Sequence, residues 1–348
     1  MKDIEELVYR IINGYYYLNI NNIIYKIVCP NLSIKQQAHN IYLSIINSNK
    51  FDDSSWIRKS EAENILNINQ LWNKDKEEQL KILNTRLEDM KIELYLKFLD
   101  PIMKKKIKAS IDTGKNKIQE MINTKHSMDH LTLENYADGL KNEHIILNTV
   151  YDNNNNLIFE RSSVDTTFFE SIVIAINKSS IGMEQLRAIA RSELWKSYWD
   201  AAKEQVFPLP AYNWTDEQRL LINLSKMYDS VKEHPECPED DVINDDDALD
   251  GWMLFHRRKI EKERKKNKLM DAVGGKYKNA NEIFIVTNSV EEAKEIYSLN
   301  DPQAMAAISH MKTLAQNSDQ PIQWADLPHV KAELQNKLKQ QQNVSKGK

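Results

Sequence analysis

The sequence has few of the residues that break helices or cross-link loops. Its 348 residues include only 8 glycines, 9 prolines and 2 cysteines. Scarce glycine and proline favour long helices over a β-fold with many turns. Two widely spaced cysteines, Cys29 and Cys237, exclude a disulfide framework and a cysteine-based zinc site. They favour a reducing, cytoplasmic setting.

Long apolar runs are also missing. No run of about 18 apolar residues occurs, so we expect no membrane span. The opening MKDIEE lacks the apolar core of a signal peptide, so we expect none. The net charge of −4 argues against general polyanion binding by the whole chain. With 41% hydrophobic and 28% charged residues, the composition is that of a folded protein rather than a disordered one.

Helical periodicity is the strongest pattern that the sequence does contain. Residues 34–48 have helical spacing, and Pro101 separates two longer helices that together predict a helical hairpin. The first of them carries an apolar seam at Leu80, Leu83, Leu87, Met90 and Leu94. The second, over 102–123, carries Ile107, Ile111, Ile118 and Ile122. The predicted fold class is therefore mainly α (α+β), with helical bundles and one or two small β-hairpins.

Two segments have the pattern of β-hairpins. Residues 15–20 and 23–28 are β-branched and aromatic, and Asn21-Asn22 between them tolerates the positive φ of a two-residue turn. A second hairpin is predicted over 145–161, around a turn that contains four consecutive asparagines. The first hairpin also presents an edge that another chain can pair with, which keeps a homo-oligomer among the alternatives.

The middle of the chain, over 183–231, is predicted to be strongly helical. A wide apolar arc over 186–206 indicates a helix packed on two sides, and Thr215 with Gln218 forms a capping box. Residues 168–176 are a buried run of ambiguous type. The predicted organisation is an N-terminal α+β domain 1–150, a helical domain 151–235, a linker of acidic loop and basic helix 236–275, a C-terminal helical segment 276–338 and a disordered tail 339–348.

Two charge blocks of opposite sign stand next to each other. Residues 236–250 contain eight acidic and no basic residues, and 257–268 contain eight basic and two acidic ones. We expect the acidic run to contact a basic surface, with 257–268 a candidate in the same chain. Between the blocks, Trp252 suits either an anchor for a partner or a contact that docks the next helix on its own core. The predicted partner-binding residues are Asp250, Trp252, Met253, Phe255, Arg257 and Arg258.

Two other chemistries have candidate residues. The basic helix 257–268 suits contacts to nucleic-acid phosphates, although aromatic interleaving is missing and the acidic run would repel phosphate. A metal-dependent enzyme would use the spacing of His126, Asp129 and His130, followed by Glu134, Glu143 and His144. The glutamate that a zincin-type site needs after its first histidine is absent. The acidic run does not match the calcium-binding EF-hand loop in either register.

No catalytic motif is present. The sequence has no G-x-S-x-G, no P-loop and no G-x-G-x-x-G. We therefore expect no enzyme activity, no cofactor and no resident metal.

Three segments of the second half, 186–206, 233–241 and 245–259, together resemble tail-assembly proteins of large contractile-tailed bacteriophages, including baseplate-hub factors. The residues that carry this resemblance are Trp195, Tyr198, Trp199, Pro235, Pro238, Asp250, Gly251 and Trp252. The resemblance implies a non-enzymatic structural protein or assembly chaperone. Its partners would be other phage tail or baseplate proteins, in the host cytoplasm during assembly or in the virion.

Overall fold

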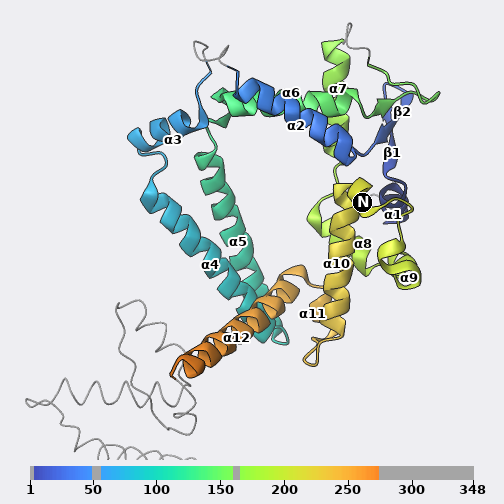
Figure 1. Cartoon of the computed structure of the whole chain (residues 1–348). Coiled ribbons are helices and arrows are strands. Elements are labelled where there is room, and N and C mark those ends of the chain that lie inside the picture. Colours follow the sequence, from blue (N-terminus) through green and yellow to red (C-terminus); the bar gives the residue numbers. More distant parts are fainter. Residues whose placement is uncertain (1–3, 49–55, 160–164, 274–348) are drawn as a thin grey trace, which may run out of the picture. The chain divides into compact units, whose positions relative to one another are not determined.

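A computed structural model describes residues 4–48, 56–159 and 165–273 (Figure 1). These residues form 12 α-helices and one three-stranded antiparallel sheet in the order β1-β2-β3. The predicted fold class, mainly helical with a small β component, is confirmed. The predicted C-terminal helical segment 276–338 and the tail 339–348 lie outside the described residues.

The chain divides into two compact units, 1–255 and 256–348. The boundary placed near residue 150 falls inside the first unit, because elements from both sides of it pack together. Helix α1 (Ile4–Asn13) packs against α8 (Met183–Arg191), and β3 (Val150–Tyr151) pairs with β2 (Ile23–Val28). The second boundary, near 235, also falls inside this unit. The described part of the second unit is the remainder of α12 (Asp246–Val273) after residue 255.

The first predicted hairpin is confirmed residue by residue. Strand β1 (Tyr15–Ile20) pairs with β2, and Ile20 lies opposite Ile23. Asn21 and Asn22 between them have φ of 52° and 64°, the left-handed conformation that a two-residue turn matching the strand twist requires.

The second predicted hairpin is wrong in extent. Residues 145–147 belong to helix α6 (Leu133–Leu147), and a single bridge joins Tyr151 to Leu157. The carboxylate of Asp152 accepts hydrogen bonds from the backbone N–H groups of Asn154 and Asn156, both 2.8 Å long. These bonds close the asparagine-rich turn locally, so that its flanks pair only through this bridge.

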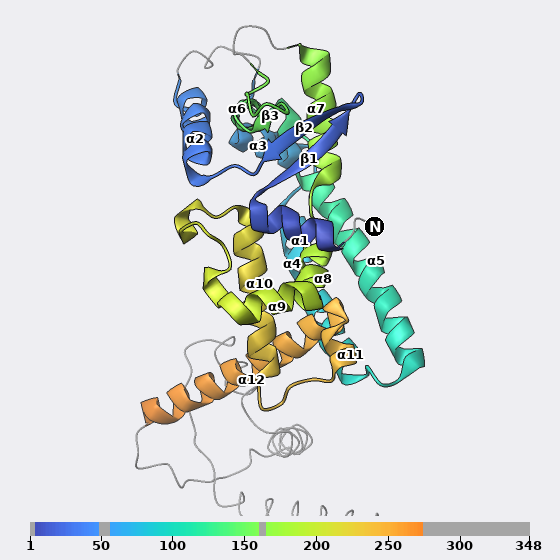
Figure 2. The same cartoon turned by 90° about the vertical axis from the view of Figure 1, so that its right-hand side faces the viewer.

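Helices cover the inner face of the sheet. The ambiguous run 168–176 lies in α7 (Thr166–Ser179), whose Ile172 packs with Ile20, Ile27 and Val150. Both views show α7 beside the two long strands (Figures 1 and 2). Helix α2 (Leu32–Ile46), which confirms the helix predicted over 34–48, packs along α6.

The predicted helical hairpin is confirmed as α4 (Lys74–Leu96) and α5 (Pro101–Lys125), which lie side by side in Figure 1. Asp100 caps α5 by accepting from the N–H groups of Ile102 and Met103, and proline fits the first helical position. Helix α3 (Lys59–Ile68) precedes the hairpin. Leu94 and Ile111 are fully buried where α4 and α5 meet.

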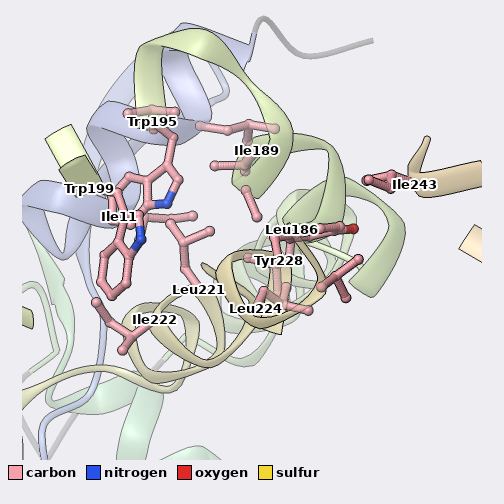
Figure 3. Packing of buried hydrophobic residues seen from close by; sticks show 14 of the residues in the cluster. Ile11, Leu186, Ile189, Trp195, Trp199, Leu221, Ile222, Leu224, Tyr228 and Ile243 are labelled. Atoms are coloured by element: carbon pink, nitrogen blue, oxygen red, sulfur yellow. The ribbon is translucent and has the colours of Figure 1, made fainter. Parts of the chain in front are cut away.

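The main core lies among α1, α8, α9 (Glu193–Ala202) and α10 (Asp216–Lys232). Figure 3 shows the indoles of Trp195 and Trp199 against Ile11, Leu221 and Ile222. The segment 186–206 is not one helix, because Ser192 is extended and its hydroxyl caps α9 instead. The capping box of Thr215 and Gln218 at the start of α10 is confirmed.

The predicted acidic loop is largely helical. Residues 240–243 form α11 (Asp240–Ile243), and α12 begins at Asp246. Asp245 caps α12, since its side chain accepts from the N–H of Ala248 and its carbonyl accepts from Leu249. Helix α12 is therefore continuous through the tryptophan segment and into the basic block, whose predicted helicity is confirmed.

Candidate functional site

Four aspartates at the start of α12 bind basic side chains from three other helices. Asp250 contacts Lys91 of α4 and Arg187 of α8, both at 2.7 Å. The remaining pairs are Asp245 with Lys104 and Lys108, Asp246 with Arg187 and Arg191, and Asp247 with Lys91 and Lys115. We call these four residues and their six partners the aspartate cluster. The acidic run thus contacts a basic surface, as expected, and that surface is made by α4, α5 and α8. A contact of the run with residues 257–268 stays a prediction.

The electrostatics of the aspartate cluster favour its charged forms. Burial by itself would lower the pKa of Lys91, but the hydrogen bond to Asp250 and the two nearby carboxylates outweigh it and raise that pKa. Burial would likewise raise the pKa of Asp247, yet Lys115 and Lys91 hold it below its ordinary value. Each of the four carboxylates pairs with two cations, and these ion pairs link α12 to α4, α5 and α8.

Trp252 follows this cluster and lies in the core. Its side chain is only 4% exposed and packs with the main core. The indole N–H donates to the backbone carbonyl of Glu236 at 3.1 Å, and the ring meets His234 edge-on. This placement corrects the interpretation of Trp252 as an exposed anchor and agrees with the alternative, in which it docks α12 onto its own core.

The other predicted partner-binding residues divide into two groups. Asp250 is engaged in the aspartate cluster, Met253 is partly buried against the main core, and the ring of Phe255 lies 6.0 Å from that of Tyr95. Arg257 is exposed and lies 3.9 Å from Glu261 one turn later, while Arg258 is half-buried. Contact of a partner with Arg257 or Arg258 stays a prediction.

The proposed metal-binding residues do not converge. Helix α5 ends at Lys125, and the Nδ1 atom of His126 then lies 2.8 Å from the Asp129 carboxylate. His144 is buried on α6, and Glu134 accepts from the backbone N–H of Lys59. Within the described ranges, no group of three histidine, cysteine or carboxylate side chains is placed to hold a metal ion.

The His126–Asp129 pair borders an open cleft of about 520 Å³ between α3 and the ends of α4 and α5. Inside it, Glu77 accepts from the indole of Trp72 and from Lys125. Glu77 with Lys125 and His126 with Asp129 thus form two paired groups at the border of this cleft.

A buried polar group joins α1 to the sheet and to α10. The Arg10 guanidinium donates to the carbonyl of Ser179 and to Glu217, and it lies over the ring of Tyr16. The thiol of Cys29 is 4.0 Å from the Glu217 carboxylate. Burial, together with this carboxylate, raises the pKa of Cys29 to about 12. A thiol in this state is a poor nucleophile.

The end of the α4–α5 hairpin carries exposed apolar side chains that the sequence analysis did not single out. Leu99 is 82% exposed, Ile102 is 79% exposed and Leu96 is 57% exposed. We call these three residues the hairpin tip. Their sequence signal was their position outside the apolar seam, on both sides of the turn at Pro101.

Within the described part of the chain, no helix has the length and apolarity needed to cross a bilayer.

No family is assigned to this chain by its similarity to known proteins. Comparison with protein-family models, with curated proteins and with solved structures found no match.

Proposed function

We propose that this chain is a non-enzymatic structural or assembly protein of a tailed bacteriophage and that it acts through contacts with other proteins. The observation that carries the proposal is the hairpin tip. Large apolar side chains together on one surface are typical of contact sites, whereas scattered ones are common on any protein. At the tip, three such side chains lie within seven residues of the chain.

The surroundings of the hairpin tip indicate the chemistry of its partner. Lys97, Lys105 and Lys106 are exposed beside it, and the exposed carboxylate of Asp100, between Leu99 and Ile102, is engaged as the cap of α5. An apolar centre with a basic rim fits an apolar groove bordered by carboxylates, because opposite charges at the rim speed association and suppress wrong partners. The expected partner is therefore an acidic face of another tail or baseplate protein.

The rest of the architecture supports this role. The ion pairs of the aspartate cluster link α12 to α4, α5 and α8. They thereby brace the α4–α5 hairpin, which carries the tip. The bacteriophage assignment is supported by the resemblance in the second half of the chain. Trp195, Trp199 and Trp252, which carry that resemblance, are core residues, so it concerns the architecture of this part.

The first experiment is size-exclusion chromatography with light scattering and with absorbance at 260 and 280 nm. A defined protein species free of nucleic acid supports the proposal. A particle whose 260 nm absorbance is stripped by salt would instead favour nucleic-acid binding through 257–268.

The second experiment replaces the tip. The double variant Leu99→Gln/Ile102→Gln should fold normally, because exposed substitutions usually change stability by less than about 0.5 kcal/mol. In cells producing the phage that encodes the chain, it should reduce the yield of tailed particles. The matched control is Ile68→Gln on α3, which is 79% exposed and away from the tip. Equal particle yield from the double variant and the control would contradict the proposal.

A further inference from the structure

Strand β1 is the open edge of the sheet. In the order β1-β2-β3, β1 has a neighbour on one side only. The two-residue turn makes Ile20 and Ile23 a hydrogen-bonded pair, and the bond from Cys29 N to Gly14 O continues the same alternation. The N–H and C=O groups of Tyr15, Tyr17 and Asn19 therefore point away from β2. Among the described residues, no backbone group pairs with them.

Four of the devices by which proteins protect such an edge are missing from β1. Natural edge strands carry charges, prolines or bulges, or they are very short. Strand β1 reads YYYLNI over six residues, without a charge or a proline, and its register with β2 is unbroken. Tyr17, near its middle, is 58% exposed. This edge is thus ready to accept another strand.

The composition of the edge selects its occupant. An antiparallel pair of two β1 strands brings uncharged residues opposite uncharged residues, so no like charges meet across the two-fold axis. Two cations lie against the rings of β1, and both are engaged within the chain: Arg10 over the ring of Tyr16 and with Glu217, and Lys26 over the ring of Tyr15 and with the side chain of Asn155. A strand with a charged face would gain no complementary charge from β1, whereas a second copy matches it in length and in aromatic character.

We propose that β1 pairs antiparallel with β1 of a second copy of this chain, so that two three-stranded sheets join into one sheet of six strands. This homodimer goes beyond the proposed function, since it requires no phage partner and uses a surface other than the hairpin tip.

The test uses two substitutions at Tyr17 in the full chain. Tyr17→Pro removes the outward N–H but no hydrogen bond to β2, which is where an edge strand tolerates proline. Tyr17→Thr removes the same ring and keeps the N–H, so it is the matched control. Light scattering should give twice the 40.7 kDa chain mass for the parent and for Tyr17→Thr. Tyr17→Pro should raise the dimer dissociation constant at least about tenfold.

A second variant covers the case in which the proline unfolds the hairpin. Tyr17→Lys/Asn19→Lys places like charges opposite each other across the two-fold axis, and it should also dissociate the dimer while circular dichroism stays unchanged. The tip variant Leu99→Gln/Ile102→Gln should remain dimeric, which separates this proposal from the proposed function. A monomeric parent chain, or a dimer that survives both edge variants, would overturn the pairing.

Discussion

The backbone of Gly251 on α12 lies directly against the carbonyl group of Lys91 on α4. A β-carbon added at Gly251 would overlap that carbonyl and would lie 3.1 Å from the backbone nitrogen of Ile92. The two helices therefore cross at backbone contact, which only glycine permits. The same crossing brings Asp250 within 2.7 Å of the Lys91 ammonium. Close approach and ion pairing thus depend on one glycine.

Gly251→Ala should destabilise the chain by about 3 kcal/mol, because the obstacle is backbone and cannot move aside. Helix propensity alone predicts the opposite sign, a gain of up to about 1 kcal/mol. The matched control is Gly139→Ala on α6, where a β-carbon meets nothing within 4 Å. Urea unfolding should show a loss for the first variant and a small gain for the second. Equal free energies of unfolding would mean that the helices do not cross this closely.

Trp252→Ala should cost about 3–5 kcal/mol of stability, the usual range for removing a large buried aromatic side chain. Trp252→Phe should cost less, since it keeps most of the packing and loses the hydrogen bond to the carbonyl of Glu236. Thermal unfolding of both variants measures the difference. A Trp252→Ala variant as stable as the parent would return Trp252 to the role of an exposed anchor.

Asp247 should give the folded chain an acid-sensitive contribution to stability. Its pKa is lowered in the folded state, because its ion pairs outweigh its burial. The carboxyl group of an unfolded aspartate has a pKa of about 3.9. The contribution is therefore complete above the unfolded pKa and is lost as the pH falls through the folded one.

The measurement is urea unfolding between about pH 7 and pH 3, a window that brackets the ordinary carboxyl pKa. Asp247→Asn should flatten the decline in stability at the acid end. Asp241→Asn, at an exposed position on α11, serves as control and should leave the decline unchanged. Parallel curves for the parent and Asp247→Asn would rule out the contribution.

The two thiols should differ strongly in reactivity. At pH 8, a thiol whose pKa is about 12 is ionised in only about one molecule in 10,000. Cys237 is exposed. Ellman's reagent should therefore label the parent chain in a fast phase that Cys237→Ser abolishes, leaving Cys29 to react at least about a hundredfold more slowly. In denaturant, Cys29 should react at the ordinary rate. Fast labelling of folded Cys237→Ser would show that Cys29 is not protected.

Local signals in the sequence predicted the elements that depend on a few neighbouring residues. Asn21-Asn22 set the first hairpin because both residues tolerate positive φ. Pro101 after Asp100 set the turn between α4 and α5, and Thr215 with Gln218 set the start of α10. In each case, turn and capping chemistry acts over at most four residues, so the pattern is readable without the fold.

The inferences that failed assumed that a helix continues for as long as its residue spacing continues. The break at Ser192 was missed, because an extended serine that caps α9 leaves the apolar spacing on both sides intact. The metal hypothesis rested on the spacing of His126, Asp129 and His130, which places them on one face only if a helix continues through them, yet α5 ends at Lys125. Periodicity describes the face of a helix only as far as the helix continues.

The sequence by itself determined the mainly helical class, the first hairpin and the helical hairpin, because turn residues and apolar spacing act locally. Only the tertiary structure decided the role of 245–252. There, aspartates that were expected to contact a basic surface, with only 257–268 as a candidate, meet lysines and arginines from α4, α5 and α8, and Trp252 enters the core. The physical reason is that these partners lie between 55 and 159 residues away in the sequence, and no local pattern encodes contact over such a separation.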